Sequence, residues 1–152
     1  MGDFNPRAGL TTERGLIGTQ PNLVSPGKRM LSSMSPTIIA RAGRPVLVLG
    51  SPGGRTIINT VLGIIVNHLV HGLPIQKAVD TPRLHHQWLP DRLQVEAGAL
   101  PAATRAALEK MGHVIQQRGG SQGSAMAISV RKDGKLEAGC DHRRPDSAAA
   151  GY

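Results

Sequence analysis

The sequence is poor in cysteine and in aromatic residues. Among 152 residues there is one cysteine, Cys140, and the aromatic side chains are limited to Phe4, Trp88 and Tyr152. A single cysteine excludes an internal disulfide and a metal site built from several thiolates, and a small buried residue is its simplest interpretation. Three aromatic rings offer few faces on which nucleic-acid bases could stack.

Acidic residues are also scarce, since 10 Asp and Glu stand against 18 Lys and Arg and give a net charge of +8. Such a balance first suggests a nucleic-acid partner. The basic residues are scattered, however, and they cluster only as pairs at Lys28-Arg29, Arg131-Lys132 and Arg143-Arg144. No run is dense enough to follow a phosphate backbone. We therefore expect no nucleic-acid partner, while an anionic small substrate or an acidic protein partner fits the charge.

Long apolar runs are missing as well. The most apolar segment, residues 57–70, is shorter than the roughly 20 residues that cross a bilayer, and it contains Asn59, Asn67 and His68. It predicts a core helix and no membrane span. The first residues, M-G-D-F-N-P-R, lack the basic and apolar regions of a signal peptide.

Glycine and proline are plentiful, with 19 and 11 residues, and they divide the chain into short elements. Residues 1–30 show little periodicity and are interpreted as an extended segment that needs a neighbour to become ordered. Residues 37–41 and 45–50 predict a hairpin buried on both faces, and residues 53–71 predict a helix that packs on both sides and ends at Gly72.

The rest of the sequence predicts a helix over 75–80, a strand over 92–96, a helix over 102–111, a strand over 113–117 and a hairpin of 125–130 with 135–139. Between the first helix and strand of this series, residues 83–91 are expected to be irregular. No repeat or linker interrupts residues 31–152, so we expect one layered α/β domain there.

The double glycine Gly53-Gly54 follows a strand and opens a helix. Backbone N–H groups at such a helix start are unpaired and favour negative charge, so the turn is a candidate anion or oxyanion site. A nucleotide-binding loop is disfavoured, because the stretch from Gly50 is one residue too short and Arg55 stands where lysine is required. A tight turn alone also explains both glycines.

Ser32 and Ser33 precede the first strand without a G-x-S-x-G elbow, which suits carboxylate binding better than nucleophilic attack. A serine-rich turn is the simpler alternative. His85 and His86 are adjacent and lack companions at metal-ligand spacing. We expect core or hydrogen-bonding histidines packed beside Trp88, and no metal.

Four stretches together resemble the C-terminal part of the small subunit of the γ-glutamyltranspeptidases, also called glutathione hydrolases. They are P-G-K-R-M-L-S-S-M-S-P-T, G-S-P-G-G-R-T-I-I-N-T-V, D-T-P-R-L-H-H-Q-W-L-P-D-R-L-Q-V-E and D-H-R-R-P-D-S-A-A-A-G-Y, in family order over nearly the whole chain. The resemblance implies an α/β fold that is part of an αββα N-terminal-nucleophile hydrolase sandwich with antiparallel sheets. It also implies acyl transfer from glutathione or other γ-glutamyl compounds without a cofactor, and a periplasmic or extracellular location.

The resemblance further implies roles for individual residues. Gly53 and Gly54 would supply the N–H groups of an oxyanion hole, and Ser32 and Ser33 would hold the substrate α-carboxylate. Asp3, in M-G-D-F, would pair with the substrate α-amino group. Each role fits the chemistry of its side chain or backbone group.

The family's nucleophilic N-terminal threonine and the arginine of its large subunit have no counterpart in this sequence. Thr11 and Thr12 are internal and lack the free α-amino group that acts as the base. We therefore expect a fragment that is inactive alone and that needs the large subunit and the N-terminal part of the small subunit. A non-catalytic γ-glutamyl-binding or regulatory module is the alternative.

Overall fold

The computed structural model describes all residues except 1–3, 6, 10 and 151–152. Its strands are β1 (Thr37–Arg41), β2 (Arg44–Gly50), β3 (Leu84–His85), β4 (Leu93–Val95), β5 (Ile115–Gln117), β6 (Met126–Val130) and β7 (Leu136–Cys140). Its helices are α1 (Ile57–Ile65), α2 (Ile75–Asp80) and α3 (Ala102–Lys110), with 3-10 turns at Gln20–Asn22 and Gly54–Thr56 and a π-helical turn at Val66–Val70.

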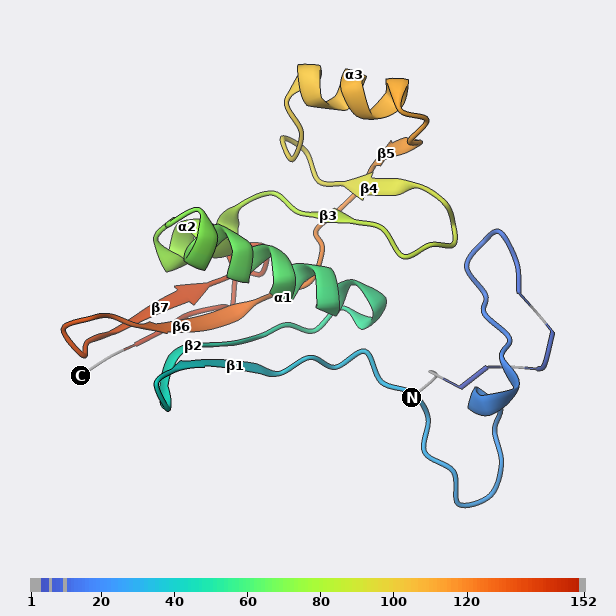
Figure 1. Ribbon diagram of the computed structural model, residues 1–152, viewed down its shortest axis with the longest axis horizontal. Helices are drawn as coiled ribbons and strands as arrows, with labels where there is room; N and C mark the ends of the chain where they lie inside the picture. The colour runs from blue at the N-terminus through green and yellow to red at the C-terminus, as the bar shows by residue number, and fades with distance from the viewer. Residues whose placement is uncertain (1–3, 6, 10, 151–152) are drawn as a thin grey trace.

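The main sheet is antiparallel, with the order β1-β2-β6-β7, and α1 and α2 cover one of its faces (Figure 1). The core lies between this face and the two helices. It is built from ten buried residues: Leu47, Leu49, Ile57, Val61, Ile64, Ile75, Ala78, Val79, Ala125 and Ala127. Cys140 is buried in β7, as expected.

The β1–β2 hairpin is confirmed, but the prediction that it is buried on both faces is wrong for this chain. Leu47 and Leu49 point into the core, whereas Ile38 is 70% exposed and Val48 is 38% exposed. Side chains alternate between the two faces of a strand, and the helices cover only one face. Ile38, Val48 and Ile128 are register partners in one row, and they leave an apolar strip uncovered.

The predicted helix after the double glycine is also confirmed, as a 3-10 turn, α1 and the π-helical turn in succession. It does not pack on both sides. Val61 and Ile64 are buried, while Ile58 and Leu62 are each 55% exposed. Apolar residues on all sides of the helix therefore did not show that it packs against the rest of the chain on one side only.

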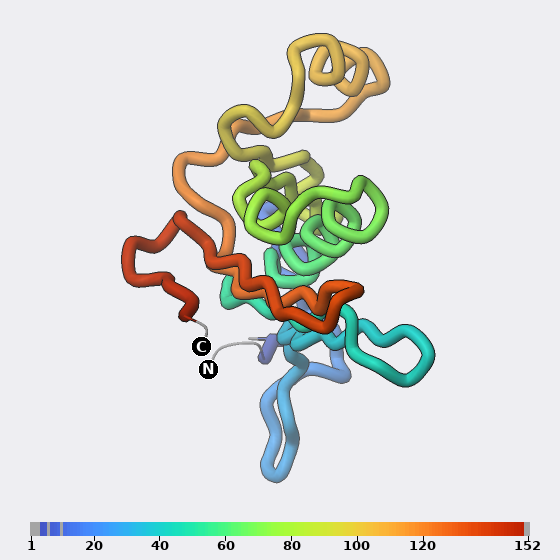
Figure 2. Tube along the Cα trace, turned by 90° about the vertical axis from the view of Figure 1, so that its left-hand side faces the viewer, coloured from blue at the N-terminus to red at the C-terminus, as the bar shows by residue number. Residues whose placement is uncertain are grey.

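The second sheet has the order β3-β4-β5. Strand β3, which was not expected, consists of two residues and pairs with β4. Strands β4 and β5 are parallel, and the connection between them contains α3. The predicted strands near 92–96 and 113–117 and the predicted helix are confirmed. Figures 1 and 2 show α3 at one end of the molecule, with the chain before β1 extending from the other end.

The described residues before β1 hold one 3-10 turn and otherwise irregular chain, as expected. Within this segment, Asn5 N donates to Asn22 O at 2.9 Å. Arg55, at the start of the helical stretch, connects the segment to the rest of the fold by donating to the carbonyl of Gly15. None of the helices in the described part of the chain is long and apolar enough to cross a membrane.

Candidate functional site

The structure brings the serine stretch and the double glycine together. Thr37 pairs with Leu49, so the residues before β1 and after β2 meet at one end of the hairpin. There the Ser33 hydroxyl donates a hydrogen bond to the carbonyl of Gly54 at 2.8 Å. Two motifs 21 residues apart in sequence thus form one surface.

Backbone conformation and space both require glycine at position 53. Its φ is +143°, and an added Cβ would lie 2.7 Å from Thr56 Oγ1. Thr56 closes the turn, since its N–H and its hydroxyl donate to the carbonyl of Gly53 at 3.2 and 3.0 Å. The turn is therefore fixed by a hydrogen-bonded ring rather than by the glycines alone.

The amide N–H groups of Gly53 and Gly54 make no hydrogen bond within the described part of the chain, and both residues are exposed. They lie at the start of a helical stretch, where the summed peptide dipoles favour negative charge. The turn can therefore donate two hydrogen bonds to an anionic or developing oxyanionic oxygen.

A second glycine turn, which sequence reasoning did not connect with the first, supports it. Gly123 has φ +70°, and a Cβ there would lie 2.6 Å from Ser51 Oγ and 3.1 Å from Pro52 O. Ser124 N donates to Ser51 Oγ at 3.1 Å. The G-G-S-Q-G stretch was visible in the sequence, but its packing partner was not.

The two serines have different hydrogen-bonding states. Ser32 is exposed, and its hydroxyl oxygen accepts a bond from Met34 N at 3.1 Å, so its hydrogen can be donated elsewhere. Ser33 is half-buried and already donates to Gly54. A carboxylate could take the hydroxyl of Ser32 directly, whereas it would have to displace the Ser33–Gly54 bond.

Asp3 lies outside the described residues. Among the described residues, Asn22 connects Asn5 to the serine stretch: its carbonyl accepts from Asn5 N, and its Oδ1 accepts from Leu31 N at 3.1 Å. Leu31 is the residue before Ser32. Asn5 is thus linked through Asn22 to the residue before Ser32.

His85 is buried and its Nε2 contacts Gln87 Oε1 at 2.8 Å, while His86 contacts Asp91 at 3.1 Å. Both histidines are hydrogen-bonded, as expected. Trp88 does not pack into the core beside them, because 64% of it is exposed. Within the described residues, no three His, Cys, Asp or Glu side chains form a group that could hold a metal ion.

A buried ionic cluster of Arg83, Glu96, Asp141 and Arg143 was not anticipated. Arg83 donates to Asp141 at 2.7 Å, and Arg143 donates to Glu96 at 2.6 Å and to Asp141 at 3.1 Å. Asp141 is completely buried and also accepts from Ala125 N at 2.7 Å. The cluster joins the end of α2, β4, the start of β6 and the residues after β7.

Hydrogen bonds decide the ionisation of the two carboxyl groups. Burial alone would raise the pKa of Asp141, but bonds from the backbone N–H groups of Ala125 and Arg143 and from Arg83 lower this pKa. Burial opposes the charge of Glu96 in the same way, and bonds from Arg143 and from two backbone N–H groups lower the pKa of Glu96. Both carboxylates are therefore ionised at neutral pH.

The guanidinium groups respond differently. Burial, with a further contribution from the neighbouring charge of Arg143, lowers the pKa of Arg83. Burial also opposes the charge of Arg143, but hydrogen bonds to Glu96 and Asp141 outweigh it and raise the pKa of Arg143. Two cations thus face two anions, and the cluster as a whole is neutral.

Comparison with known proteins gives the same family as the motifs. The family model for gamma-glutamyltranspeptidase matches residues 1–151. The chain is 45% identical over 152 residues to the glutathione hydrolase proenzyme of Escherichia coli (strain K12), covering 100% of this chain and 26% of that protein. It is 42% identical over 147 residues to the corresponding proenzyme of Pseudomonas aeruginosa, covering 94% of this chain and 26% of that protein.

The crystal structure of the T380A mutant of Helicobacter pylori gamma-glutamyltranspeptidase has a similar fold. Its TM-score is 0.85 at 39% identity, over 93% of this chain and 77% of that one. The expected fold, part of an N-terminal-nucleophile hydrolase sandwich with antiparallel sheets, is thereby confirmed. The chain spans about a quarter of the length of the curated relatives it matches. With a family model that covers residues 1–151 and relatives aligned across the sequence, this chain belongs to the gamma-glutamyltranspeptidase family.

Proposed function

We propose that the chain supplies the γ-glutamyl-binding part of an acyl-transfer site and depends on a nucleophile outside its own sequence. The observation that carries this proposal is the contact between Ser33 and Gly54, which sets hydroxyl groups beside two unpaired backbone amides. The names of the relatives, glutathione hydrolase proenzymes, indicate the substrate class.

In this proposal the substrate α-carboxylate accepts hydrogen bonds from the serine hydroxyls. Ser32 has its hydrogen available, because its oxygen is the acceptor in the bond to Met34. Ser33 donates to the carboxylate after it releases Gly54 O. Hydrogen bonds to a charged group are stronger than neutral ones, so the exchange at Ser33 is favourable. Asp3 would pair with the α-ammonium group from the segment that Asn5 and Asn22 anchor.

The amides of Gly53 and Gly54 would act on the scissile γ-carbonyl. As the external hydroxyl forms its bond to this carbon, the carbonyl oxygen gains negative charge and accepts from both amides. Collapse of the intermediate breaks the C–N bond and expels the amine, which takes the proton that the attacking hydroxyl gave up. Water then cleaves the ester, which releases the γ-glutamyl acid and returns a proton to the hydroxyl. Loss of one oxyanion donor typically lowers kcat by about 10²–10³-fold.

The test is hydrolysis of a γ-glutamyl anilide by the 152-residue chain alone and by the chain joined to a family segment that carries the N-terminal threonine, together with the large subunit. We expect no turnover by the chain alone and turnover by the reunited protein. Turnover by the isolated chain would contradict the proposal. Substrate binding without turnover in both forms would favour the non-catalytic γ-glutamyl-binding module.

A further inference from the structure

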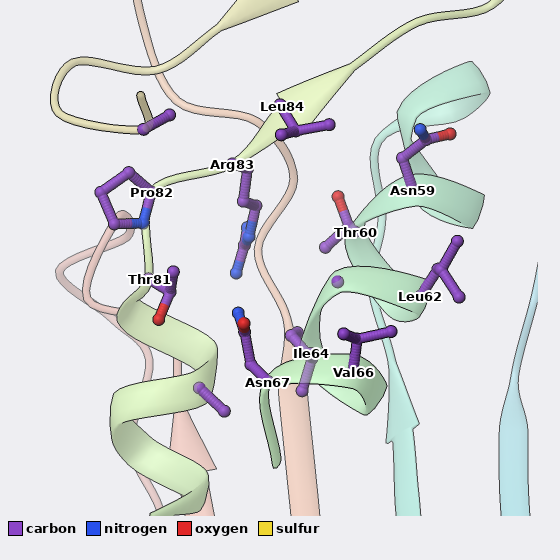
Figure 3. A pocket seen from close by; sticks show the side chains of 13 residues that line it. Asn59, Thr60, Leu62, Ile64, Val66, Asn67, Thr81, Pro82, Arg83 and Leu84 are labelled. Carbon is purple, nitrogen blue, oxygen red and sulfur yellow. The ribbon is translucent and has the colours of Figure 1, made fainter. Parts of the chain in front are cut away.

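A hollow lies between α1 and the connection from α2 to β3, further along α1 from the glycine turn (Figure 3). Its volume is about 330 Å³, within the range of small-molecule sites. Most of its lining is apolar, including Ile64, Pro82 and Leu84. Like typical ligand sites, it combines apolar walls with a few polar groups.

Gly63 keeps one wall of this hollow open. It lies inside α1, where glycine is less favourable than alanine. A Cβ added at Gly63 would meet no atom within 4 Å apart from the backbone of its own helix and its chain neighbours. No surrounding group in the described chain therefore excludes a side chain at this position, and the space beside it is free for a ligand.

Asn67 supplies the polar end of the hollow. It is half-buried in the π-helical turn, a conformation that often occurs at functional sites. Figure 3 shows its amide directed toward Thr81 and Arg83, yet this amide makes no hydrogen bond within the described residues. The Thr81 hydroxyl donates to Lys77 O at 2.8 Å, so its oxygen is left as an acceptor.

We propose that this hollow binds a small neutral molecule that carries a primary carboxamide on an apolar body. The two N–H groups of the carboxamide match the acceptors Asn67 Oδ1 and Thr81 Oγ1, and its carbonyl matches the donor Asn67 Nδ2. A carboxylate has no hydrogen to donate and would set its charge against both oxygens. The charge of the adjacent Arg83 is already balanced by Asp141, and its Nε, which has no hydrogen-bond partner among the described residues, is buried and faces no free space.

The proposal can be tested by titrating the ¹⁵N-labelled 152-residue chain with isovaleramide and following its amide NMR signals. We expect saturable shifts at the Asn67 side-chain amide and the Gly63 backbone amide, with a millimolar dissociation constant that suits so small a ligand. Isovalerate, which has the same shape but is charged, should bind roughly 10- to 100-fold more weakly, because it cannot donate to the two acceptor oxygens and sets its charge against them.

Two substitutions on this helical stretch separate the polar and steric parts of the proposal. Gly63→Leu fills the hollow and Asn67→Leu removes the polar group, and both introduce a better helix former, so the fold is retained. Each should weaken isovaleramide binding roughly tenfold or more. The control is Thr104→Leu, on the exposed α3, which should leave binding unchanged.

Equal binding of isovalerate, shifts that map elsewhere, or full binding by Gly63→Leu would overturn the proposal. In the reunited protein, an Asn or Gln side chain of another segment could fill the hollow instead of a free ligand. Repeating the titration on that protein separates the two: isovaleramide should still bind if the hollow takes a free ligand, and it should not bind if a side chain already fills the hollow. None of these readouts depends on γ-glutamyl turnover, so this proposal and the proposed function can fail separately.

Discussion

Removal of the Asp141 carboxylate should destabilise the fold strongly. In Asp141→Ala, the Arg83 guanidinium loses the carboxylate that it contacts at 2.7 Å, and the buried N–H of Ala125 loses its acceptor. The contact between the Arg143 side chain and the Asp141 carboxylate at 3.1 Å is lost as well. The variant therefore leaves the charge of Arg83 without its counterion, although the guanidinium still donates to the carbonyls of Val79 and Gln122. It also leaves a buried backbone donor without an acceptor.

The expected loss follows from this geometry. Removing one partner of a buried ion pair costs about 3–5 kcal/mol, because the remaining charge stays desolvated. The total stability of a domain is typically about 5–15 kcal/mol. Asp141→Ala should thus remove a large share of the free energy of unfolding. A partly unfolded population at room temperature would agree with this prediction.

Urea denaturation followed by circular dichroism measures this change as a shift of the transition midpoint at constant slope. Asp133→Ala is the matched control, because Asp133 pairs with Arg131 at 3.5 Å and both side chains are about half exposed. It should cost under about 1 kcal/mol. The double variant Arg83→Met with Asp141→Leu should recover part of the loss, since neither charge is left alone.

Equal and small effects of Asp141→Ala and Asp133→Ala would refute this reasoning. Such a result would mean that water or a rearranged side chain replaces the carboxylate without cost. A double variant that is less stable than Asp141→Ala would also refute it, because the desolvated charge of Arg83 could not then be the source of the loss.

Three further predictions concern the glycines and the pH dependence. Gly139→Ala should lower stability by about 1–3 kcal/mol in urea denaturation, because a Cβ there lies 3.0 Å from Ile75 O, whereas Gly119→Ala has open space and should be neutral. Glu96 and Asp141 have lowered pKa values when folded, so their stabilisation should be complete above about pH 4.5 and lost as the pH falls through the lower folded-state values. Acid titration of Glu96→Gln should show a smaller loss. Gly53→Ala should distort the turn and lower kcat of the reunited enzyme about 100-fold or more, as expected for a lost oxyanion donor.

Local patterns were sufficient to predict most elements of the fold. Short apolar segments that end at glycine or proline mark the hairpins and helices. The two-residue β3 could not be predicted, because it depends on pairing with β4 rather than on its own composition. The uncovered faces of β2 and α1 were missed because an apolar run does not reveal which layers cover it.

In the candidate site, too, some contacts follow from local structure and others depend on tertiary packing. The β1–β2 hairpin lies between Ser33 and Gly54 in the sequence, and its pairing brings both residues to the same end of the hairpin. Their contact therefore follows from local structure. The ionic cluster joins Arg83 to Asp141 across 58 positions, and no spacing rule relates them. Their charges were visible in the sequence, but their burial depends on tertiary packing.

The measurement that tests the proposed γ-glutamyl site most directly is the separate effect of Ser32→Ala on KM and kcat in the reunited enzyme. The Ser32 hydroxyl is exposed and free to donate to a carboxylate that is bound alike in the ground and transition states. We expect a KM about 10-fold higher or more, with kcat within about twofold of the unmodified enzyme. Ser25→Ala, in the exposed N-terminal segment, should change neither constant. An unchanged KM in Ser32→Ala, or a loss confined to kcat, would contradict the assignment of this serine to the substrate carboxylate.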